Sequence, residues 1–137
     1  MKKNLIITMS LILVSCVTTY AQTLKIDVRG IEKVTGALNV ALYDSSETFL
    51  KRPVTAFRVD VSDTNLVLSC PGLPTGTYAI SMYQDENKNN KLDTGMFGIP
   101  VEKYGFSNDA MGYAGPPSFK ECKFVFDKDM TTVINLK

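Results

Sequence analysis

Acidic and amide side chains alternate in one short stretch, Asp85-Glu86-Asn87-Lys88-Asn89-Asn90-Lys91-Leu92-Asp93. Oxygen-bearing side chains at every second position are the ligands that a hard cation such as Ca²⁺ selects. In a calcium loop of the EF-hand type, the ligands would be side chains of Asp85, Asn87, Asn89 and Asp93 and the backbone carbonyl of Lys91. The spacing therefore predicts a Ca²⁺ site formed by Asp85, Asn87, Asn89, Lys91 and Asp93.

Two positions depart from that loop pattern. Asn90 stands where a glycine is usual, which is a mild change because asparagine tolerates left-handed backbone angles. Met96 stands where a bidentate glutamate is expected, so the shell needs a further oxygen from Glu102, Asp109, Asp44 or a carbonyl of the following loop. We therefore expect weak binding, with a dissociation constant of about 10⁻⁴–10⁻³ M. The alternative is a polar turn without metal, since Asn and Asp also bond their own backbone.

The stretch leads into a long segment, residues 85–119, in which aromatic residues stand among glycines and the strand pattern stops. Exposed aromatic rings bind sugars, peptides and apolar ligands by stacking. The candidate ligand-binding residues are Phe97, Tyr104, Phe106 and Tyr113. The alternative is that these rings, with Phe119, form the small core of a compact loop.

Period-two alternation of apolar and polar residues dominates the rest of the chain and predicts half-buried strands. About seven strands are expected, over residues 24–28, 38–43, 54–61, 65–70, 77–84, 121–126 and 131–136. Residues 45–51 could form one or two turns of helix. Tyr78, shortly after a Pro/Gly turn, is typical of a sandwich corner, where the hydroxyl bonds upstream backbone. The pattern predicts an all-β fold: a single immunoglobulin-like or transthyretin-like (prealbumin-type) β-sandwich with one long Gly/aromatic-rich loop.

The N-terminus has the features of a secretory signal peptide: two lysines, a short apolar run and a small-x-small cleavage pattern ending at Ala21. We expect a signal peptide over residues 1–21 and one domain over residues 22–137. The protein would then be exported, to the periplasm or outside the cell, without a transmembrane helix. Cys16 also fits the site at which bacterial lipoproteins are cleaved and acylated, so a lipid anchor at Cys16 is the alternative.

Composition excludes several kinds of chemistry. The chain has no histidine, which excludes Ser–His–Asp triads, Cys–His pairs and histidine-ligated zinc. A formal net charge of +1 gives no electrostatic basis for nucleic-acid binding. Cys70 and Cys122 are a disulfide candidate in an oxidising compartment, or two separate buried thiols. Paired carboxylates could hydrolyse glycosides, but nothing in the sequence fixes their separation.

Several of these motifs also occur together in one family. The turn and strand at residues 76–80, the alternating stretch at residues 85–93, the Phe97–Asn108 region and Gly115-Pro116-Pro117-Ser118-Phe119 resemble the bacterial domain-of-unknown-function family numbered 2141. This resemblance implies a small exported β-sandwich domain and carries no activity or catalytic residues over to the chain.

These observations lead to one functional hypothesis. The chain is expected to be an exported, non-enzymatic β-sandwich module in which a weak structural Ca²⁺ loop supports an aromatic loop that binds a small ligand or an envelope protein. The alternatives are a purely structural accessory protein of the cell envelope or an N-terminally lipidated lipoprotein without metal, and, second, a carboxylate-dependent hydrolase.

Overall fold

The computed structural model describes residues 21–137. The predicted signal peptide, with the lipidation candidate Cys16, lies outside the described residues except for Ala21. The strands are β1 (Thr23–Arg29), β2 (Ala37–Tyr43), β3 (Thr55–Asp60), β4 (Leu66–Pro71), β5 (Gly76–Asp85), β6 (Tyr104–Phe106), β7 (Phe124–Phe126) and β8 (Met130–Asn135). Two 3₁₀ turns, Met96–Gly98 and Ser107–Asp109, and one short helix, α1 (Phe119–Cys122), complete the described elements.

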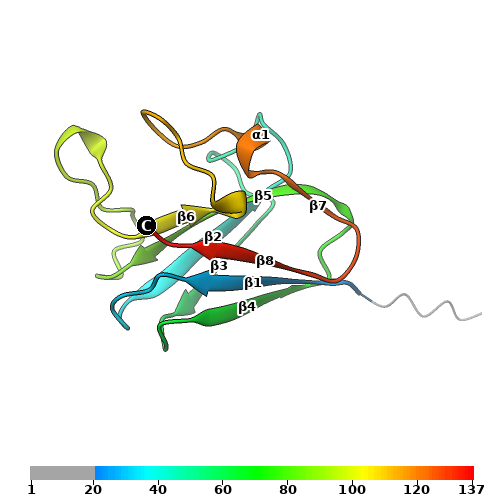
Figure 1. The fold of residues 1–137 in the computed structure, drawn as a ribbon, viewed down its shortest axis with the longest axis horizontal. Coiled ribbons are helices and arrows are strands. Elements are labelled where there is room, and N and C mark those ends of the chain that lie inside the picture. Colours follow the sequence, from blue (N-terminus) through cyan, green and yellow to red (C-terminus); the bar gives the residue numbers. More distant parts are fainter. Residues whose placement is uncertain (1–20) are drawn as a thin grey trace, which may run out of the picture.

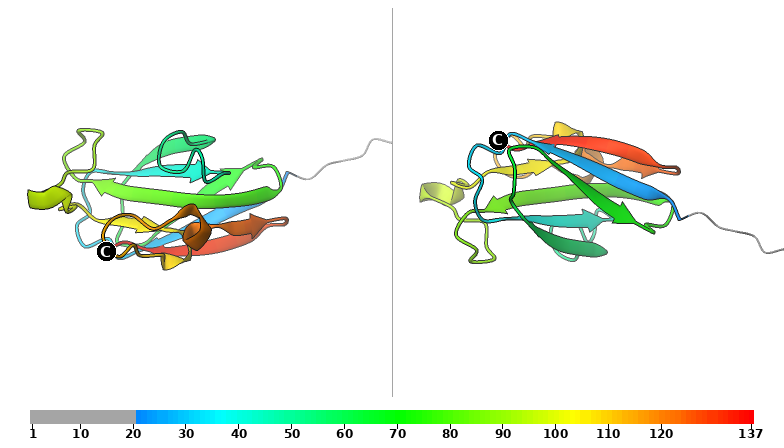
Figure 2. Two further views of the ribbon diagram at one scale, coloured as in Figure 1. Left: turned by 90° about the horizontal axis from the view of Figure 1, so that it is seen from above. Right: turned by 90° about the horizontal axis from the view of Figure 1, so that it is seen from below.

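The strands form two sheets that pack face to face (Figure 1). One sheet has the order β4-β1-β8, and the other has the order β3-β2-β5-β6, with β7 paired to the start of β5. The β1–β8 pair is parallel, whereas the other pairs are antiparallel. Figure 2 shows the two layers edge-on, with the N-terminal end of the described chain at one end and the loop around Met96–Gly98 at the other. The all-β sandwich prediction is confirmed at this level.

Alternating strand residues build the core between the sheets. Leu24, Ile26 and Val28 of β1 are fully buried, and Leu38, Val40 and Leu42 of β2 are buried opposite them. Lys25, Asp27 and Arg29 of β1 lie on the outer face, as the period of two requires. At about 25 cal/mol per Å² of apolar surface removed from water, this layer supplies most of the driving force for folding.

The two sheets join along one side through β6 and the C-terminus. The backbone N–H of Tyr104 donates to the carbonyl of Lys137 at 3.2 Å, and the N–H of Lys137 donates to the carbonyl of Tyr104 at 2.9 Å. Gly105 permits this contact, because a Cβ there would lie 2.7 Å from Cγ2 of Ile134. β6 therefore has both of its edges paired, one with β5 and one with the chain terminus.

All seven predicted strands are present, but three local predictions were wrong. Residues 45–51 form turns rather than a helix, because Leu50 has a left-handed φ of 58° that does not fit an α-helix. The strand predicted over residues 121–126 starts only at Phe124, because a capping box between Ser118 and Glu121 begins helix α1 just before it. The long loop also contains β6, which is too short for a periodic signal.

Candidate functional site

Asp85, the last residue of β5, organises the alternating stretch, which we call the Asp85 loop (residues 85–93). Its carboxylate is fully buried and accepts hydrogen bonds from the backbone N–H groups of Asn89 at 3.0 Å and Asn90 at 2.8 Å. The guanidinium of Arg58, on the edge strand β3, lies 3.5 Å from Oδ2 of Asp85. A buried charge without such partners would cost several kcal/mol. Asp85 therefore holds the loop onto the end of the sandwich.

The two asparagines of the loop both turn toward Asp93. Asn87 Nδ2 donates to one oxygen of the Asp93 carboxylate at 2.6 Å, and Asn89 Nδ2 donates to the other at 2.8 Å. Their own amide oxygens accept backbone N–H groups two residues further on, from Asn89 at 3.1 Å and Lys91 at 2.9 Å. Asn90 has φ 64°, the left-handed angle expected for the position that is usually glycine. The loop thus gathers the predicted ligand side chains into one turn.

Glu102, which follows the Asp85 loop in the chain, stabilises this loop through two hydrogen bonds. The residue is 7% exposed, and its carboxylate accepts the backbone N–H of Glu86 at 2.9 Å and of Asp93 at 2.9 Å. The sequence offered Glu102, Asp109 and Asp44 as side chains that could complete the cation shell. Of these three, Glu102 is the one that hydrogen-bonds to the loop. Asp109 instead accepts two hydrogen bonds from Asn135, and Asp44 follows the end of β2 that pairs with the start of β5. Antiparallel pairing of β2 and β5 therefore separates Asp44 from Asp85.

The donor set fits a weak hard-cation site but does not require one. Two carboxylates and two amides are ligands for Ca²⁺, and rotation of each amide by 180° would turn its oxygen, in place of its nitrogen, toward Asp93. Arg58 already supplies a positive charge at Asp85. Among residues 21–137 there is no group of three or more His, Cys, Asp or Glu side chains placed to hold a metal ion. The side chain of Lys91 is exposed, so Lys91 could contribute only its carbonyl.

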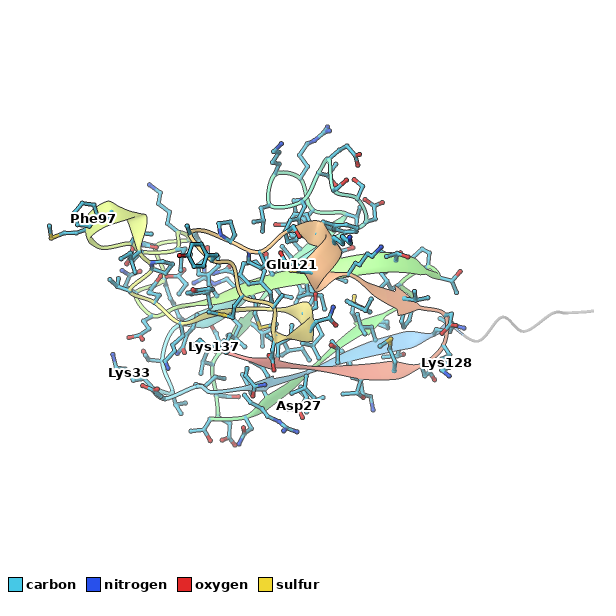
Figure 3. All side chains as sticks on the ribbon, turned by 45° about the horizontal axis from the view of Figure 1, so that its top comes forward. Asp27, Lys33, Phe97, Glu121, Lys128 and Lys137 are labelled. Carbon is cyan, nitrogen blue, oxygen red and sulfur yellow. The ribbon has the colours of Figure 1, made fainter. Side chains whose placement is uncertain are left out.

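A short apolar hairpin grows directly out of this loop; we call it the Phe97 hairpin (residues 94–101). Thr94 and Pro100 form a β-bridge, the N–H of Gly95 donates to the carbonyl of Ile99 at 2.7 Å, and the N–H of Val101 donates to the carbonyl of Asp93 at 2.9 Å. The side chain of Phe97 is 93% exposed, and its backbone has φ 60°. Figure 3 shows Phe97 projecting from the end of the molecule. The exposed apolar side chains of the hairpin are those of Met96, Phe97, Ile99 and Val101.

The Phe97 hairpin forms one wall of an aromatic groove of about 710 Å³. The opposite wall is the Tyr113 segment (residues 112–117), and the floor is the outer face of β5 and β6. All four rings that the sequence proposed as ligand-binding residues line this groove: Phe97, Tyr104, Phe106 and Tyr113. Tyr113 is fully exposed, whereas Phe106 is 7% exposed at the bottom.

Phe106 also belongs to a second apolar cluster beneath the groove, which we call the loop cluster: Tyr43, Phe49, Ala79, Phe106 and Cys122, with Tyr104 and Phe119 packed against it. The ring of Phe49 lies 5.8 Å from that of Phe119, and the rings of Tyr104 and Phe106 lie 6.1 Å apart, centroid to centroid. The two interpretations of the aromatic segment, ligand binding and a small loop core, thus apply to different rings. Phe106 and Phe119 serve as a small core, while Phe97 and Tyr113 remain exposed.

A protein-family model covers most of this chain. Residues 26–134 match the model of the family described as "Uncharacterized protein conserved in bacteria (DUF2141)". The chain belongs to the DUF2141 family. No curated protein and no solved structure matches it. The match covers both the sandwich and the Asp85 loop, so the candidate site lies inside the DUF2141 region.

Tyr83 and Leu50 are among the residues of the groove in this DUF2141 domain that sequence reasoning missed. Tyr83 lies on β5 directly opposite Tyr104 of β6, so both rings sit on the groove floor. Its place two residues before Asp85 on an alternating strand could have indicated an outward-facing ring. Leu50 lines the groove with a left-handed φ of 58°, which nothing in its sequence context indicates. Burial, followed by the charges of Asp85 and Glu102, raises the pKa of the Tyr83 phenol.

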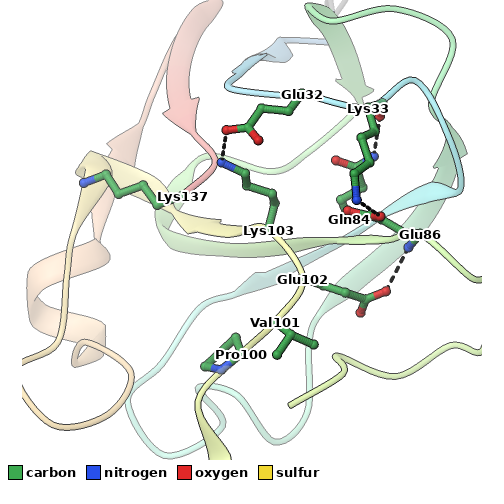
Figure 4. A pocket seen from close by; sticks show the side chains of 9 residues that line it. All are labelled: Glu32, Lys33, Gln84, Glu86, Pro100, Val101, Glu102, Lys103 and Lys137. Carbon is green, nitrogen blue, oxygen red and sulfur yellow. Dashed lines mark hydrogen bonds and ion pairs between the residues drawn. The ribbon is translucent and has the colours of Figure 1, made fainter. Parts of the chain in front are cut away.

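Glu102 also lines a second, smaller cleft of about 260 Å³ (Figure 4). Four of its charged groups form two ion pairs: Lys103 lies 2.6 Å from Glu32, and Lys33 lies 3.0 Å from Glu86. Buried Gln84 donates to the carbonyls of Lys33 and Thr35 and holds the β1–β2 connection in place. These contacts give the cleft a packing role beside the loop.

The two cysteines are free and separate. Cys70 lies in the main core, whereas Cys122 lies in the loop cluster. The structure therefore has two buried thiols, the alternative to the disulfide candidate. Burial raises the pKa of Cys70, and burial with the charge of Glu121 raises the pKa of Cys122 to about 11. Neither thiol is poised as a nucleophile at neutral pH.

Proposed function

We propose that this DUF2141 protein is an exported, non-enzymatic binding module that takes an uncharged apolar ligand or protein segment into its aromatic groove. The observation that carries the proposal is the groove of about 710 Å³ between two projecting loops, with Phe97 and Tyr113 exposed on opposite walls. Ligand sites are typically apolar concavities of about 300–1,000 Å³. Large apolar side chains at the rim are costly to leave in water unless a partner covers them.

The lining also supports binding in preference to catalysis. The residues of the groove carry no carboxylate, thiol or amine side chain that could transfer a proton or attack a substrate. The carboxylate of Asp93, between the lining residues Leu92 and Thr94, accepts from two asparagine amides, and that of Glu102 accepts from two backbone N–H groups. Non-enzymatic binding is the simplest function for this combination.

The Asp85 loop is proposed to act as a weak Ca²⁺ clamp that supports the groove. Leu92 and Thr94, at the junction of the loop and the Phe97 hairpin, both line the groove. Asp93 joins the two parts, because its carbonyl accepts from Val101 and its N–H donates to Glu102. A cation held by Asp85, Asn87, Asn89 and Asp93 would restrict the base of the hairpin. The role of the cation would be structural. Without metal, Arg58 would still supply a positive charge at Asp85.

We further propose that the sandwich is of the immunoglobulin-like or transthyretin-like type and that it acts outside the cytoplasm. The hydroxyl of Tyr78 donates to the carbonyl of Pro74 at 2.9 Å, the contact predicted for a corner tyrosine. The signal-peptide pattern before Ala21 supports export to the periplasm or beyond, with a lipid anchor at Cys16 as the alternative. Within residues 21–137, no helix is long and apolar enough to cross a bilayer. An envelope protein is then a natural partner.

The binding claim can be tested with an uncharged apolar dye, N-phenyl-1-naphthylamine, whose fluorescence rises in apolar sites. Titration of the domain should give saturable binding, and the double variant Phe97→Ala/Tyr113→Ala should bind about tenfold more weakly, because each ring is an exposed anchor. The matched control is Val67→Ala/Val125→Ala, which removes two exposed apolar side chains remote from the groove. Equal affinity of the two double variants would contradict the proposal.

The Ca²⁺ claim is tested by thermal melting. With a dissociation constant of about 1 mM, about 10 mM Ca²⁺ should stabilise the fold by about 1.4 kcal/mol, which is a shift of a few degrees. Asp93→Asn should lose this shift, whereas Lys91→Ala should keep it because only the carbonyl of Lys91 is used. No shift in the parent protein would leave the loop as a polar turn and favour the structural alternative without metal.

A further inference from the structure

Two uncharged loops flank the aromatic groove: the Phe97 hairpin (residues 94–101) and residues 110–117, which include the Tyr113 segment. Neither loop contains an acidic or basic residue, although charged residues make up 21% of the chain. Met96 of the first loop is 79% exposed, and Tyr113 of the second is fully exposed. Exposed apolar side chains gathered in one region mark a contact with a protein or with a membrane.

The Phe97 hairpin, which projects from the end of the molecule (Figure 3), is apolar on both sides. Phe97 and Ile99 line the aromatic groove, whereas Val101 lines the smaller cleft beside Glu102. Met96 lines neither of these two cavities and is exposed. A rigid protein surface would cover one side of such a convex tip and leave the other side in water. A fluid layer of acyl chains covers all sides at once.

The tip of the hairpin also offers few hydrogen bonds to a partner. No side chain in residues 95–101 contains a nitrogen or oxygen atom. The backbone N–H of Gly95 donates to the carbonyl of Ile99 at 2.7 Å. The N–H of Gly98 donates back to the carbonyl of Gly95 at 3.3 Å, and Pro100 has no N–H. Protein interfaces carry about one hydrogen bond per 100–200 Å², so the chemistry of the tip fits hydrocarbon better than a protein surface.

Charges return at the base of the hairpin. Lys91 precedes the hairpin and is exposed, and a lysine can lay its stem along apolar surface while its amine stays in water. The carboxylates of Asp93 and Glu102, on either side of the hairpin in the chain, each accept two hydrogen bonds. An apolar tip above a polar base matches the passage from acyl chains to headgroups, a level at which tyrosine is also enriched.

We infer that the two loops dock the protein on the surface of a phospholipid bilayer, with the tip of the Phe97 hairpin and the ring of Tyr113 inserted at the boundary between headgroups and acyl chains. The inserted groups are uncharged, so a bilayer without net charge, such as phosphatidylcholine, is sufficient. This contact goes beyond the proposed function, because it requires no ligand in the aromatic groove.

Insertion can be followed with a fluorescent reporter. The chain contains no tryptophan, so Phe97→Trp places a single one at the tip of the hairpin. Residues 21–137 of this variant, which contain the complete sandwich, are titrated with phosphatidylcholine vesicles. We expect the emission to shift to shorter wavelength and to be quenched by brominated phosphatidylcholine. The matched control is Val67→Trp on the exposed face of β4, whose emission should stay that of a ring in water. Figure 2 shows the N-terminal end opposite the hairpin, so a purification tag there leaves the tip free.

Sedimentation with the same vesicles measures the strength of binding. A single myristoyl chain binds bilayers at about 10⁴ M⁻¹, and the tip should bind no more tightly, so lipid is raised to about 10 mM. Phe97→Asp should weaken binding at least about tenfold, because a charge replaces an inserted ring. Aspartate tolerates the φ of 60° at this position. The matched control, Val67→Asp, should bind like the parent protein. Binding of the parent should change by less than about twofold in about 1 M salt, because the tip is uncharged.

Three results would overturn the inference. The first is no binding of the parent protein at about 10 mM phosphatidylcholine. The second is binding that requires an anionic lipid, phosphatidylglycerol, and is lost in salt. The third is a shift of the Phe97→Trp emission that grows with protein concentration in the absence of vesicles, which would show that a second copy covers the tip. Dye titration without vesicles tests the proposed function separately. Saturable dye binding without vesicle binding would leave the proposed function standing, and the reverse result would overturn only the proposed function.

Discussion

Two sets of aromatic rings within one segment of this DUF2141 chain have opposite environments. Phe106 and Phe119 are packed in the loop cluster, whereas Phe97 and Tyr113 project into solvent from the two walls of the groove. The sets have the same residue types and stand in similar glycine-rich surroundings. They differ in the backbone that carries them.

The packed rings sit on elements with external partners. Phe106 is on β6, which pairs with β5, and Phe119 begins helix α1, whose capping box fixes its orientation. Phe97 sits on a hairpin that is closed by its own backbone contacts, including the bridge between Thr94 and Pro100, and Tyr113 sits on a turn in which Gly112 closely approaches the backbone of Gly115. A ring is therefore buried when its backbone is attached to the sandwich and is presented when its backbone is closed on itself. The predictions below test this contrast.

The largest difference in the free energy of unfolding should be found when one packed ring and one exposed ring are each truncated to alanine. Phe106→Ala should destabilise the domain by about 3–5 kcal/mol, because it removes buried surface and leaves a cavity. Phe97→Ala should change the free energy of unfolding by less than about 0.5 kcal/mol, because its ring contacts solvent. Urea denaturation measures both. A cost of several kcal/mol for Phe97→Ala would show that the hairpin ring is a packing residue.

Alkaline pH should lower the stability of the loop cluster, which contains the packed rings, through Cys122. Its pKa of about 11 in the folded state exceeds the ordinary value of 9.0, so the neutral thiol favours the folded state. This contribution is complete below about pH 9 and is lost as the pH rises to about 11, for a total of up to roughly 3 kcal/mol. Cys122→Ala should flatten that part of the curve of stability against pH.

A residual slope should remain in Cys122→Ala. Burial also raises the pKa of Cys70 and of the Tyr78 and Tyr83 phenols, so all three groups lose folded-state stabilisation at high pH. The comparison is therefore between the slopes of the parent and the variant from about pH 9 to 11, measured by denaturation at each pH. Identical slopes would show that the thiol titrates alike in the folded and unfolded states.

The smallest of the three expected effects on stability comes from Glu102, which holds the base of the Phe97 hairpin. Glu102→Gln replaces one acceptor oxygen with an N–H₂ group that faces a backbone N–H, which should cost about 1–3 kcal/mol. It should also weaken dye binding, because Glu102 holds Asp93 at the base of the Phe97 hairpin. The control is Glu32→Gln, which breaks an exposed ion pair with Lys103 and should change the free energy of unfolding little. Equal effects would remove Glu102 from the support of the groove.

Much of the sandwich was predictable from the sequence because its signals are local. Alternation along β1 and β2 identified which side chains face the core, and the Pro/Gly turn before Tyr78 predicted its hydroxyl contact. The failures were also local. Residues 45–51 have a helical composition but too few turns to form a helix, and β6 is short and is defined only by its partners.

For the candidate site, the sequence by itself determined which residues are available: alternating carboxylates and amides from Asp85 to Asp93, followed by aromatic rings among glycines. Side-chain oxygen spacing in a turn is a property of neighbouring residues, so it can be read without the fold. The tertiary structure decided everything that depends on distant segments. It brought Arg58 and Glu102 to the loop, separated Asp44 from it and placed Tyr83 beside Tyr104. Strand register and loop closure set these contacts, and no short stretch of sequence specifies them.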